Sequence, residues 1–534
     1  MFWADELASR VSGPQVVNDS KTPSGTIHVG SLRGPVLLDV IVRALRDRGL
    51  PTQLRYGIDD LDPMDAQALL TPDAVERSMG VPLAHVPDPA PDGHASYARH
   101  FAELFIATFD GLGIRPDTYY WMSEVYAQGR MDRYIRTALE RADTIREIYR
   151  RVSHVERPEG WLPVHVICPN CGRIGTTLAT DWNGETVAFA CQPDLVAWAT
   201  GCGTTGRLNP FEGAAKLPFN VDWAAKWSLF GVTIEPCGKD LATAGGSRDR
   251  ADAIAREVFE REPPLRVDYE FLNIRGRKMS TSKGQGASAH EMADVIPPEQ
   301  LRLLFLRPRP NQAIEFDPEG TDAIPRLFDE WDRLAAAVAG REFRGELPAD
   351  HARLFAMSLI DRQDVAAEAV AYRPAFAHLA FLIQLPDADL QAKLEAEKGA
   401  PLTERERAIV DERARAARAW LDNYAPERAR VQVQDHVPDE VGALSPSQRS
   451  FLASLADRLT DPGAARWSGD ALQSAVFETA KDVELPAGQA FAALYAAFLG
   501  RPNGPRAGWL LVSLERELVV ARLREAATAG TLTG

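Results

Sequence analysis

The chain has 534 residues, 45% of them hydrophobic and 25% charged, which is an ordinary composition for folded globular domains. This length predicts about two to four domains. The formal net charge of −15 argues against a protein that binds nucleic acid without specificity, because such proteins are usually basic.

Targeting signals and cysteine content indicate where such a chain would work. No apolar run of about eighteen residues occurs, and the N-terminus lacks a basic stretch followed by an apolar one, so we expect neither a membrane helix nor a secretory signal. Five cysteines in a chain of this length do not form a disulfide scaffold. We therefore expect a reducing cytoplasm.

The N-terminal segment predicts a β-α-β unit. A short strand over 14–18 is followed by a loop over 20–25 that contains Pro and Gly, a helix over 31–48 with apolar residues on one face, and a strand over 52–58. Such a unit implies a parallel sheet with a right-handed crossover. Ligands of that architecture bind at the carboxyl ends of the strands, where the loop falls.

The rest of the chain predicts an interrupted α/β domain and then a helical one. Residues 96–152 are mainly helical in pattern, and a cysteine-bearing insertion covers 154–218. The α/β pattern resumes with a strand over 230–235, a helix over 248–259 and a strand over 267–273. Beyond about residue 320, Ala, Leu, Arg and Glu recur at helical spacing to the end.

Two polar segments about 250 residues apart carry the strongest functional signal. Residues 22–31 read Thr-Pro-Ser-Gly-Thr-Ile-His-Val-Gly-Ser, and residues 278–284 read Lys-Met-Ser-Thr-Ser-Lys-Gly. Alone, the first is most simply a loop before a helix, and the second a solvated turn. Together and in this order they resemble the paired "HIGH" and "KMSKS" signatures of class I aminoacyl-tRNA synthetases.

The resemblance extends through residues 221–227, 235–240 and 245–249, and these stretches look like the class I lysyl-tRNA synthetase family of archaeal type. It covers about 15–320. It implies an α/β fold: a Rossmann-like (HUP-type) parallel-sheet catalytic domain with a zinc-binding insertion, followed by an all-α C-terminal domain. The implied divisions are 1–153 and 219–322 for the two halves of the catalytic domain, 154–218 for the insertion, and 323–534 for a helical anticodon-binding domain.

The activity implied is ATP-dependent ligation of lysine to tRNA(Lys) through a lysyl-adenylate. In the first step the amino acid's carboxylate attacks the α-phosphate of ATP. A carboxylate is already ionised at neutral pH, so no general base is needed, and positioning and charge stabilisation supply the catalysis. We predict catalytic roles for His28 and Gly30 at the helix start, and for Lys278 and Lys283 as a mobile clamp on pyrophosphate. Mg²⁺ is expected with the phosphates.

The ATP-binding set combines both signatures with a Gly-x-Asp element that would hold the ribose. The predicted residues are Thr22, Pro23, Ser24, Gly25, Ser31, Gly238, Asp240, Met279, Ser280 and Ser282. Two positions depart from the signatures, since Thr281 stands in place of a lysine and Ser31 in place of a histidine.

Lysine's ε-ammonium calls for a carboxylate and an aromatic face. The predicted amino-acid-binding residues are Ser20, Asp59, Asp60, Trp223, Trp227 and Tyr269. Each of them has a structural alternative. Ser20 replaces the family's usual glycine and Leu241 its usual histidine, so specificity is less firmly indicated than class.

Four cysteines within 35 residues predict a structural zinc site. Cys168 and Cys171 form a C-x-x-C knuckle, and Cys191 and Cys202 would complete a closed tetrahedral set. The alternative is four buried free thiols. Cys237 is interpreted as a packing residue. A second, weaker metal stretch consists of Asp88, Asp92, His94 and His100, with Gly93 in place of a cysteine.

The helical domain contains a group of arginines that either contacts tRNA or lies on a solvated helix among acidic residues. The group is Arg405, Arg407, Arg413, Arg415, Arg418, Arg428 and Arg430. Two functional alternatives stay open. One is a paralogue that activates another amino acid or uses another acceptor, and the other is a non-catalytic amino-acid sensor or RNA-binding relative. The expected partners are tRNA(Lys), ATP and lysine, without a membrane, and the sequence does not indicate an oligomeric state.

Overall fold

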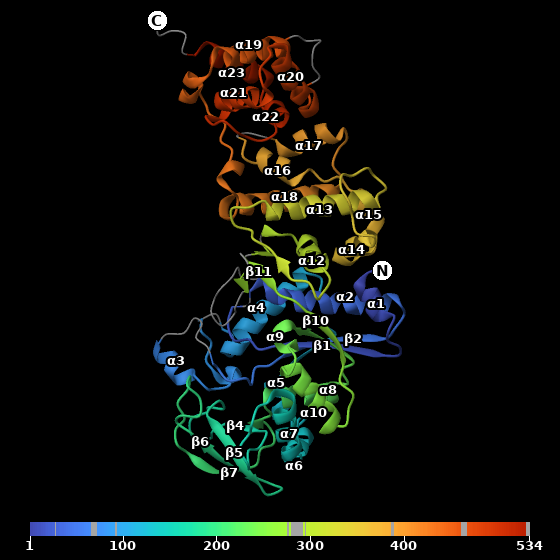
Figure 1. Cartoon of the computed structure of the whole chain (residues 1–534), viewed down its shortest axis with the longest axis vertical. Helices are drawn as coiled ribbons and strands as arrows, with labels where there is room; N and C mark the ends of the chain where they lie inside the picture. The colour runs from blue at the N-terminus through green and yellow to red at the C-terminus, as the bar shows by residue number, and fades with distance from the viewer. Residues whose placement is uncertain are drawn as a thin grey trace. The chain divides into compact units, whose positions relative to one another are not determined.

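The computed structural model describes residues 1–26, 28–65, 72–90, 93–274, 277–278, 292–293, 295–385, 389–460 and 467–529 (Figure 1). The chain divides into two compact units. The first comprises Met1–Ala293, Pro298–Phe316 and Arg344–Val365, and the second comprises Asp294–Pro297, Asp317–Phe343 and Ala366–Gly534. Within the described residues, no helix combines the length and apolar character needed to cross a membrane.

A five-stranded parallel sheet organises the first unit. Its strands are β1 (Gln15–Lys21), β2 (Thr52–Ile58), β3 (Thr118–Trp121), β9 (Ile234–Gly238) and β10 (Leu265–Tyr269). Their order in the sheet is β10-β9-β1-β2-β3, so the direction of winding reverses between β1 and β9. In open α/β sheets such a reversal opens a crevice at the carboxyl ends of the strands, which is where ligands bind.

Helix α2 (Arg33–Asp47) is the crossover between β1 and β2 and packs against β1, β2 and β9. It follows a single 3-10 turn, η1 (Val29–Leu32). Its apolar side chains are almost entirely buried, as its 3.6-residue pattern predicts. Helix α8 (Phe219–Phe230) leads into β9 and ends at Gly231, whose φ of 68° gives the left-handed conformation that terminates many helices.

The remaining elements of the first unit surround this core. The helices are α1 (Trp3–Ala8), α3 (Pro72–Ser78), η2 (Leu83–His85), α4 (Tyr97–Gly111), α5 (Met122–Ala127), α6 (Asp132–Glu140), α7 (Ala142–Ser153), α9 (Lys239–Ala242), α10 (Ser247–Glu257), α12 (Pro298–Leu306) and α14 (His351–Ser358). A small sheet of order β12-β11-β13 follows β10 and consists of β11 (Leu272–Ile274), β12 (Arg277–Lys278) and β13 (Ile314–Glu315).

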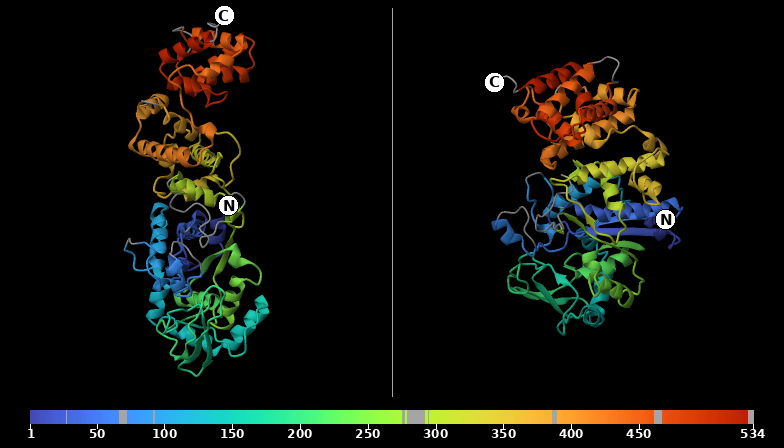
Figure 2. Two further views of the ribbon diagram at one scale, coloured as in Figure 1. Left: turned by 90° about the vertical axis from the view of Figure 1, so that its left-hand side faces the viewer. Right: turned by 45° about the horizontal axis from the view of Figure 1, so that its top comes forward.

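The insertion between α7 and α8 forms two small antiparallel sheets. One pairs β4 (His165–Val166) with β8 (Ala215–Lys216), and the other contains β5 (Thr177–Trp182), β6 (Val187–Cys191) and β7 (Thr205–Leu208). The insertion lies beside α6 and α7 in all views (Figures 1 and 2). There the Arg136 guanidinium donates to the carbonyl of Gly184 at 3.0 Å.

The second unit is helical throughout its described residues. Its elements are α13 (Ala323–Val338), α15 (Val365–Val370), α16 (Phe376–Leu382), α17 (Leu390–Lys398), α18 (Glu404–Asn423), η4 (Glu427–Ala429), η5 (Asp439–Ala443), α19 (Pro446–Thr460), α20 (Gly469–Asp482), α21 (Ala487–Leu499), α22 (Ala507–Ser513) and α23 (Arg516–Thr528). Helix α18 begins with a capping box in which Thr403 and Glu406 bond to each other's backbone N–H. The expected fold class, a parallel α/β domain followed by a helical domain, is confirmed.

Candidate active site

The loop that follows β1 crosses the carboxyl edge of the sheet. Within it the Ser24 amide donates to the carbonyl of Thr22 at 3.0 Å, and the Tyr97 hydroxyl donates to the carbonyl of Ser24 at 3.1 Å. His28 precedes η1, and its Nε2 lies 3.5 Å from Oγ of Ser31. The loop therefore leads directly into a helix start, where backbone N–H groups favour an anion such as phosphate.

The hydroxyl of Tyr269 reaches across this edge from β10 toward β1. A Cβ built on Gly34, at the start of α2, would lie 2.9 Å from Tyr269 Oη and 3.0 Å from Asp19 Oδ2. A Cβ built on Gly238, at the end of β9, would lie 3.7 Å from the same Oη. Tyr269 Oη thus lies at the reversal point between β1 and β9, and the absence of a side chain at Gly34 makes room for it.

The predicted ribose-binding element continues from β9. Gly238 ends the strand, and Lys239 and Asp240 open α9 with their side chains exposed. Nζ of Lys239 forms an ion pair with Oε1 of Glu270 at 2.7 Å. Asp240 therefore lies at the same edge as the loop after β1, and its carboxylate is placed where it could accept hydrogen bonds from a ligand.

A buried ion pair lies beneath this edge. Nζ of Lys226 is 2.6 Å from Oδ1 of Asp59 and 3.2 Å from Oγ of Ser20, and Ser20 in turn donates to Oδ2 of Asp59 at 2.8 Å. Burial alone would raise the pKa of Asp59, but the nearby ammonium groups of Lys226 and Lys216 hold it below its ordinary value. A substrate ammonium at Asp59 would therefore compete with Lys226.

Asp60 is also buried, and its carboxylate faces the start of α5. It accepts a hydrogen bond from the Ser123 amide at 2.8 Å and another from the Ser123 hydroxyl at 2.5 Å. Burial raises its pKa to about 6. In this arrangement Asp60 anchors the turn that follows β3.

The two predicted tryptophans share one carboxylate. Nε1 of Trp223 donates to Glu235 at 2.8 Å and Nε1 of Trp227 donates to Glu235 at 2.6 Å. The Arg248 guanidinium carbon lies 4.6 Å from the Trp227 ring centroid. Trp227 has no exposed surface and Trp223 is 5% exposed, so both indoles belong to the core behind the site in this structure.

Sequence reasoning missed Asp19, a residue of β1. The Ser20 amide donates to its Oδ1 at 2.8 Å, and within the described chain no basic side chain forms an ion pair with it. Burial and the negative charge of Glu235 raise the pKa of Asp19 to about 8. Side chains alternate between the two faces of a strand, so Asp19 lies on the same face as Val17 and Lys21 and on the opposite face from Asn18 and Ser20. This alternation was the signal in the sequence from which Asp19 could have been found.

The second signature lies largely outside the described residues. The backbone of Lys278 forms the end of β12, paired with Asn273 of β11. Met279, Ser280, Ser282 and Lys283 fall outside the described residues. The phosphate clamp therefore stays a prediction.

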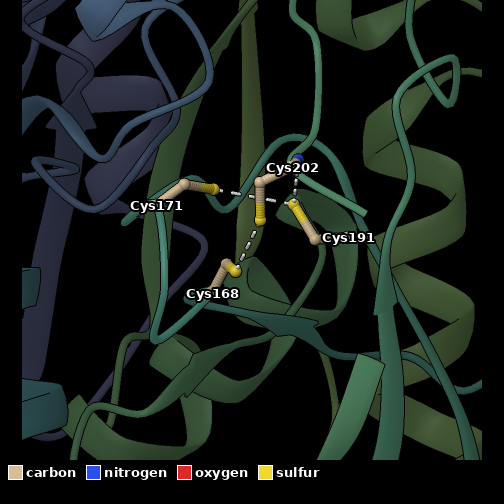
Figure 3. Close-up of side chains that lie close together, drawn as sticks. All are labelled: Cys168, Cys171, Cys191 and Cys202. Atoms are coloured by element: carbon tan, nitrogen blue, oxygen red, sulfur yellow. Dashed lines mark hydrogen bonds between the residues drawn. The ribbon is translucent and has the colours of Figure 1, made fainter. Parts of the chain in front are cut away.

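The four insertion cysteines converge on one point (Figure 3). Their sulfurs all lie within 4.8 Å of one another, with 3.6 Å between Cys168 and Cys202 and 3.7 Å between Cys171 and Cys191. Four thiolates around a tetrahedral Zn²⁺ at about 2.3 Å are separated by about 3.8 Å. The donor set and its spacing therefore fit structural zinc. Cys237 lies in β9, away from this cluster.

The suggested second metal stretch is arranged differently. Nδ1 of His100 lies 3.2 Å from Oδ1 of Asp88, and Nδ1 of His94 lies 2.8 Å from Oε2 of Glu103. Asp92 lies outside the described residues. Among the residues that the structure describes, the cysteine cluster is the one group with a metal-ligand arrangement.

Several arginines of the second unit are engaged in ion pairs. Arg413 is buried and pairs with Asp332, Arg428 pairs with Asp322 at 2.7 Å, and Arg405 pairs with Glu368 at 2.8 Å. Two others, Arg418 and Arg430, line a cavity of about 620 Å³ together with Ile383, Gln384, Leu421 and Asp422. The arginine group is therefore divided between structural ion pairs and a polar hollow.

The parallel sheet with its reversal of winding, and the order of the two signatures along the chain, point to a class I tRNA synthetase, and the family models show it. The model of the family described as tRNA synthetases class I (K) matches residues 1–360, and the model described as an anticodon binding domain matches residues 426–527. The chain belongs to the class I (K) tRNA synthetase family, as the resemblance in its motifs predicts.

Similar proteins match this chain along almost its whole length. A lysine–tRNA ligase of Archaeoglobus fulgidus is 34% identical over 98% of this chain and 100% of its own. Lysine–tRNA ligase 1 of Methanosarcina acetivorans is 34% identical over 99% of each chain. A lysine–tRNA ligase of Thermoplasma volcanium is 31% identical over 98% of this chain and 99% of its own.

Proposed function

We propose that this protein joins lysine to tRNA(Lys) in an ATP-dependent reaction that passes through a lysyl-adenylate. The observation that carries the proposal is the match to lysine–tRNA ligases at 30–34% identity over both catalytic and anticodon-binding parts. The carboxyl edge of the parallel sheet supports the proposal, because the loop after β1 (residues 22–25, below called the nucleotide loop), the Gly-x-Asp element and Tyr269 meet there.

The chemistry has two steps. The lysine carboxylate attacks the α-phosphorus of ATP, the bond to the bridging oxygen breaks, and pyrophosphate leaves with that electron pair. A ribose hydroxyl of the terminal tRNA adenosine then attacks the carbonyl carbon, its proton passes to a phosphate oxygen of the adenylate, and AMP leaves with the electron pair of the broken bond. The lysine carboxylate is already ionised, and the adenylate phosphate can accept the proton of the ribose hydroxyl, so neither step needs a strong base from the protein. The protein contributes orientation and charge stabilisation.

We assign the nucleotide to the loop 22–25, His28, Gly30 and Ser31, with the ribose at Gly238 and Asp240. The start of η1 and α2 would receive phosphate oxygens, and Mg²⁺ would accompany them. Lys278, Met279, Ser280, Ser282 and Lys283 would close over pyrophosphate.

For the amino acid, Tyr269 and Ser20 are the predicted residues best supported by geometry, since both lie at the carboxyl edge beside the reversal point. Asp59, Asp60, Trp223 and Trp227 are buried behind this edge. We propose that their contribution is to set the charge and shape of the floor on which lysine rests.

We propose that the cysteine cluster holds one structural Zn²⁺. Closed ligation by four thiolates leaves no coordination position for a substrate, so such an ion would stabilise the insertion. Thiolate ligands require reduced cysteines, and for this reason we propose the cytoplasm as the place of action.

The deciding experiment is ATP–pyrophosphate exchange with each of the twenty amino acids, in the presence and absence of bulk tRNA, followed by charging of that tRNA. We expect lysine to be activated and attached. Exchange with a different amino acid alone would remove the lysine assignment, and this is the outcome that Ser20 and Leu241 make worth testing. No exchange with any amino acid would favour the sensor alternative.

A substitution of Lys283 tests its proposed role in binding the leaving pyrophosphate. Lys283→Ala should lower the exchange rate by well over about tenfold, because a charge that stabilises leaving pyrophosphate is removed, while tRNA binding without ATP stays nearly intact. Lys481→Ala, the same change on helix α20, serves as the control. An unchanged exchange rate in Lys283→Ala would discard the role of this lysine.

A further inference from the structure

The last strand of the cysteine insertion contributes a buried cation to the catalytic unit. Lys216 lies in β8, opposite His165 of β4, and β4 leads within two residues to Cys168. The Lys216 side chain is only 5% exposed, and its Nζ lies 2.9 Å from Oδ1 of Asp62. This ion pair joins the insertion to the segment that follows β2.

The other oxygen of the same carboxylate holds the nucleotide loop. The Thr22 hydroxyl donates a hydrogen bond of 2.6 Å to Oδ2 of Asp62. Thr22 is the first residue after β1, and it is followed directly by the residues that we assign to ATP. Asp62 thus bridges an ammonium group on one side and a loop hydroxyl on the other.

We propose that Lys216 is a positioning residue for the nucleotide loop, because through Asp62 it fixes the side chain of Thr22. The cysteine insertion then contributes directly to the geometry of the ATP site, in addition to its own fold. The identification of the loop's ligand as ATP rests on the proposed function, whereas the chain of contacts from Lys216 to Thr22 does not.

Charge and burial hold the contacts between Lys216, Asp62 and Thr22 in place. Although burial opposes its charge, the carboxylates of Asp62, Asp222 and Asp59 raise the pKa of Lys216 above its ordinary value, so the ammonium stays charged. Asp62 is itself partly buried, and its backbone carbonyl accepts from the Leu83 amide at 2.9 Å. A charge-assisted hydrogen bond in such surroundings is stronger and more directional than one in water.

Without Lys216, Asp62 would face the other buried acidic groups without its cation. The carboxylate would then turn toward water or become protonated, and in either case Thr22 would lose its fixed acceptor. The other hydrogen bonds described for the loop, from the Ser24 amide to the Thr22 carbonyl and from Tyr97 to Ser24, do not replace the acceptor of the Thr22 hydroxyl. If the loop becomes ordered only when ATP binds, the cost of ordering it weakens ATP binding. The rate of the reaction within the bound complex is lowered less.

The test uses the full-length protein and two variants that remove opposite ends of the connection. Lys216→Met keeps a long side chain without its charge, and Thr22→Val keeps the shape of threonine without its hydroxyl. We expect each to raise the KM for ATP and the dissociation constant of ATP, measured by calorimetry, by about tenfold. The KM for lysine and kcat should change less.

The double variant and the conservative variants distinguish positioning from general stability. Lys216→Met combined with Thr22→Val should bind ATP no more weakly than either single variant, because both break one connection. Thr22→Ser and Lys216→Arg should recover most of the affinity. Lys398→Met, which removes a lysine from an ion pair with Glu406 in the second unit, should leave ATP binding unchanged.

Each other outcome counts against the proposal. A lowered unfolding temperature with unchanged ATP affinity would mean that Lys216 is only structural, and independent, additive losses in the double variant would mean that the two residues act separately. If Lys216→Met fails to fold, Thr22→Val and Lys216→Arg still decide the question. If the wild-type protein binds ATP but activates no lysine, the proposed function fails while calorimetry still tests this connection.

Discussion

The ammonium of Lys226 lies 2.6 Å from a carboxylate oxygen of Asp59, and both side chains are almost completely buried at the carboxyl edge of the sheet. A second carboxylate, that of Asp222, lies 3.6 Å from the same nitrogen. Asp59, at the floor of the candidate site, is therefore already paired with the protein's own lysine. Under the proposed function, a bound lysine must therefore be recognised without displacing this pair, to which Ser20 is itself hydrogen-bonded, and Tyr269, whose hydroxyl lies at the reversal point, is placed to contribute.

Replacing Lys226 with Met should destabilise the protein by about 3–5 kcal/mol, because Asp59 would be left buried without its cation. Chemical denaturation followed by tryptophan fluorescence would measure the change, since Trp223 and Trp227 lie in the same helix. Arg115→Ala is the control, because the Arg115–Asp110 pair is largely exposed, and its loss should cost about 0–1 kcal/mol. Equal effects of the two substitutions would contradict the assigned importance of the buried pair.

Much of the fold could be predicted because local patterns and tertiary packing agree. The strand 52–58 has the predicted bounds, and the helix after the loop begins only two residues later than expected. The predicted strand 230–235 instead begins at Ile234, because Phe230 still belongs to α8 and Gly231 ends that helix. Strand β3, over 118–121, was missed within a region predicted as mainly helical, since four residues between helices carry little periodic signal.

The candidate site was harder to predict than the fold. Residues in contiguous motifs, such as Thr22 and His28, could be proposed from the resemblance of the two segments to the class I signatures. Lys216 and Lys226 could not, because their importance comes from burial beside carboxylates that lie more than 150 residues away along the chain. Hydrophobic and motif patterns do not encode such pairs, which appear only when the sheet brings distant segments together.

Asp19 should make stability depend on pH in a definite direction. Its pKa is raised from 3.8 to about 8, chiefly by burial. Between these values the folded protein holds one proton more than the unfolded chain, so the contribution of Asp19 to stability is present at low pH and is lost as the pH rises toward 8. Asp19→Asn removes this loss and should raise the unfolding temperature more at pH 8 than at pH 5.

Thermal unfolding of the wild type and Asp19→Asn from pH 5 to pH 8.5 would check this sign. Asp110→Asn, at an exposed carboxyl group, should leave the change in unfolding temperature between low and high pH the same as in the wild type. A gain for Asp19→Asn that is independent of pH, or larger at pH 5, would contradict the assigned ionisation.

Metal content provides a direct test of the cysteine cluster. The purified protein should contain about one zinc per chain, and Cys168→Ser should lower this content strongly because a closed tetrahedral site loses one of its four ligands. Elemental analysis measures the content, and thermal unfolding before and after chelation measures the stabilisation. Cys237→Ser is the matched control, since Cys237 lies outside the cluster and should leave the zinc content unchanged. Wild-type protein free of zinc after purification without chelators would refute the assignment.

We predict that replacing Gly34 of α2 with alanine impairs the candidate site. In a helix, alanine is usually favoured over glycine by about 1 kcal/mol. At Gly34, however, the new Cβ would lie 2.9 Å from Tyr269 Oη and 3.0 Å from Asp19 Oδ2, so the tyrosine hydroxyl must move away from the reversal point. We expect Gly34→Ala to lower kcat/KM for lysine in pyrophosphate exchange by about tenfold or more.

Removing the hydroxyl separates a steric effect at Tyr269 from a general effect on the helix. In a Tyr269→Phe background the closest of these contacts is removed and the approach to Asp19 Oδ2 remains, so Gly34→Ala should lower kcat/KM for lysine by a smaller factor than in the wild type. Gly488→Ala is the matched control: Gly488 lies in helix α21, a Cβ there would meet no atom within 4 Å, and the change should be neutral or slightly stabilising. If Gly34→Ala lowers activity equally with and without the Tyr269 hydroxyl, the loss arises elsewhere in α2 and the placement of Tyr269 at the substrate must be abandoned.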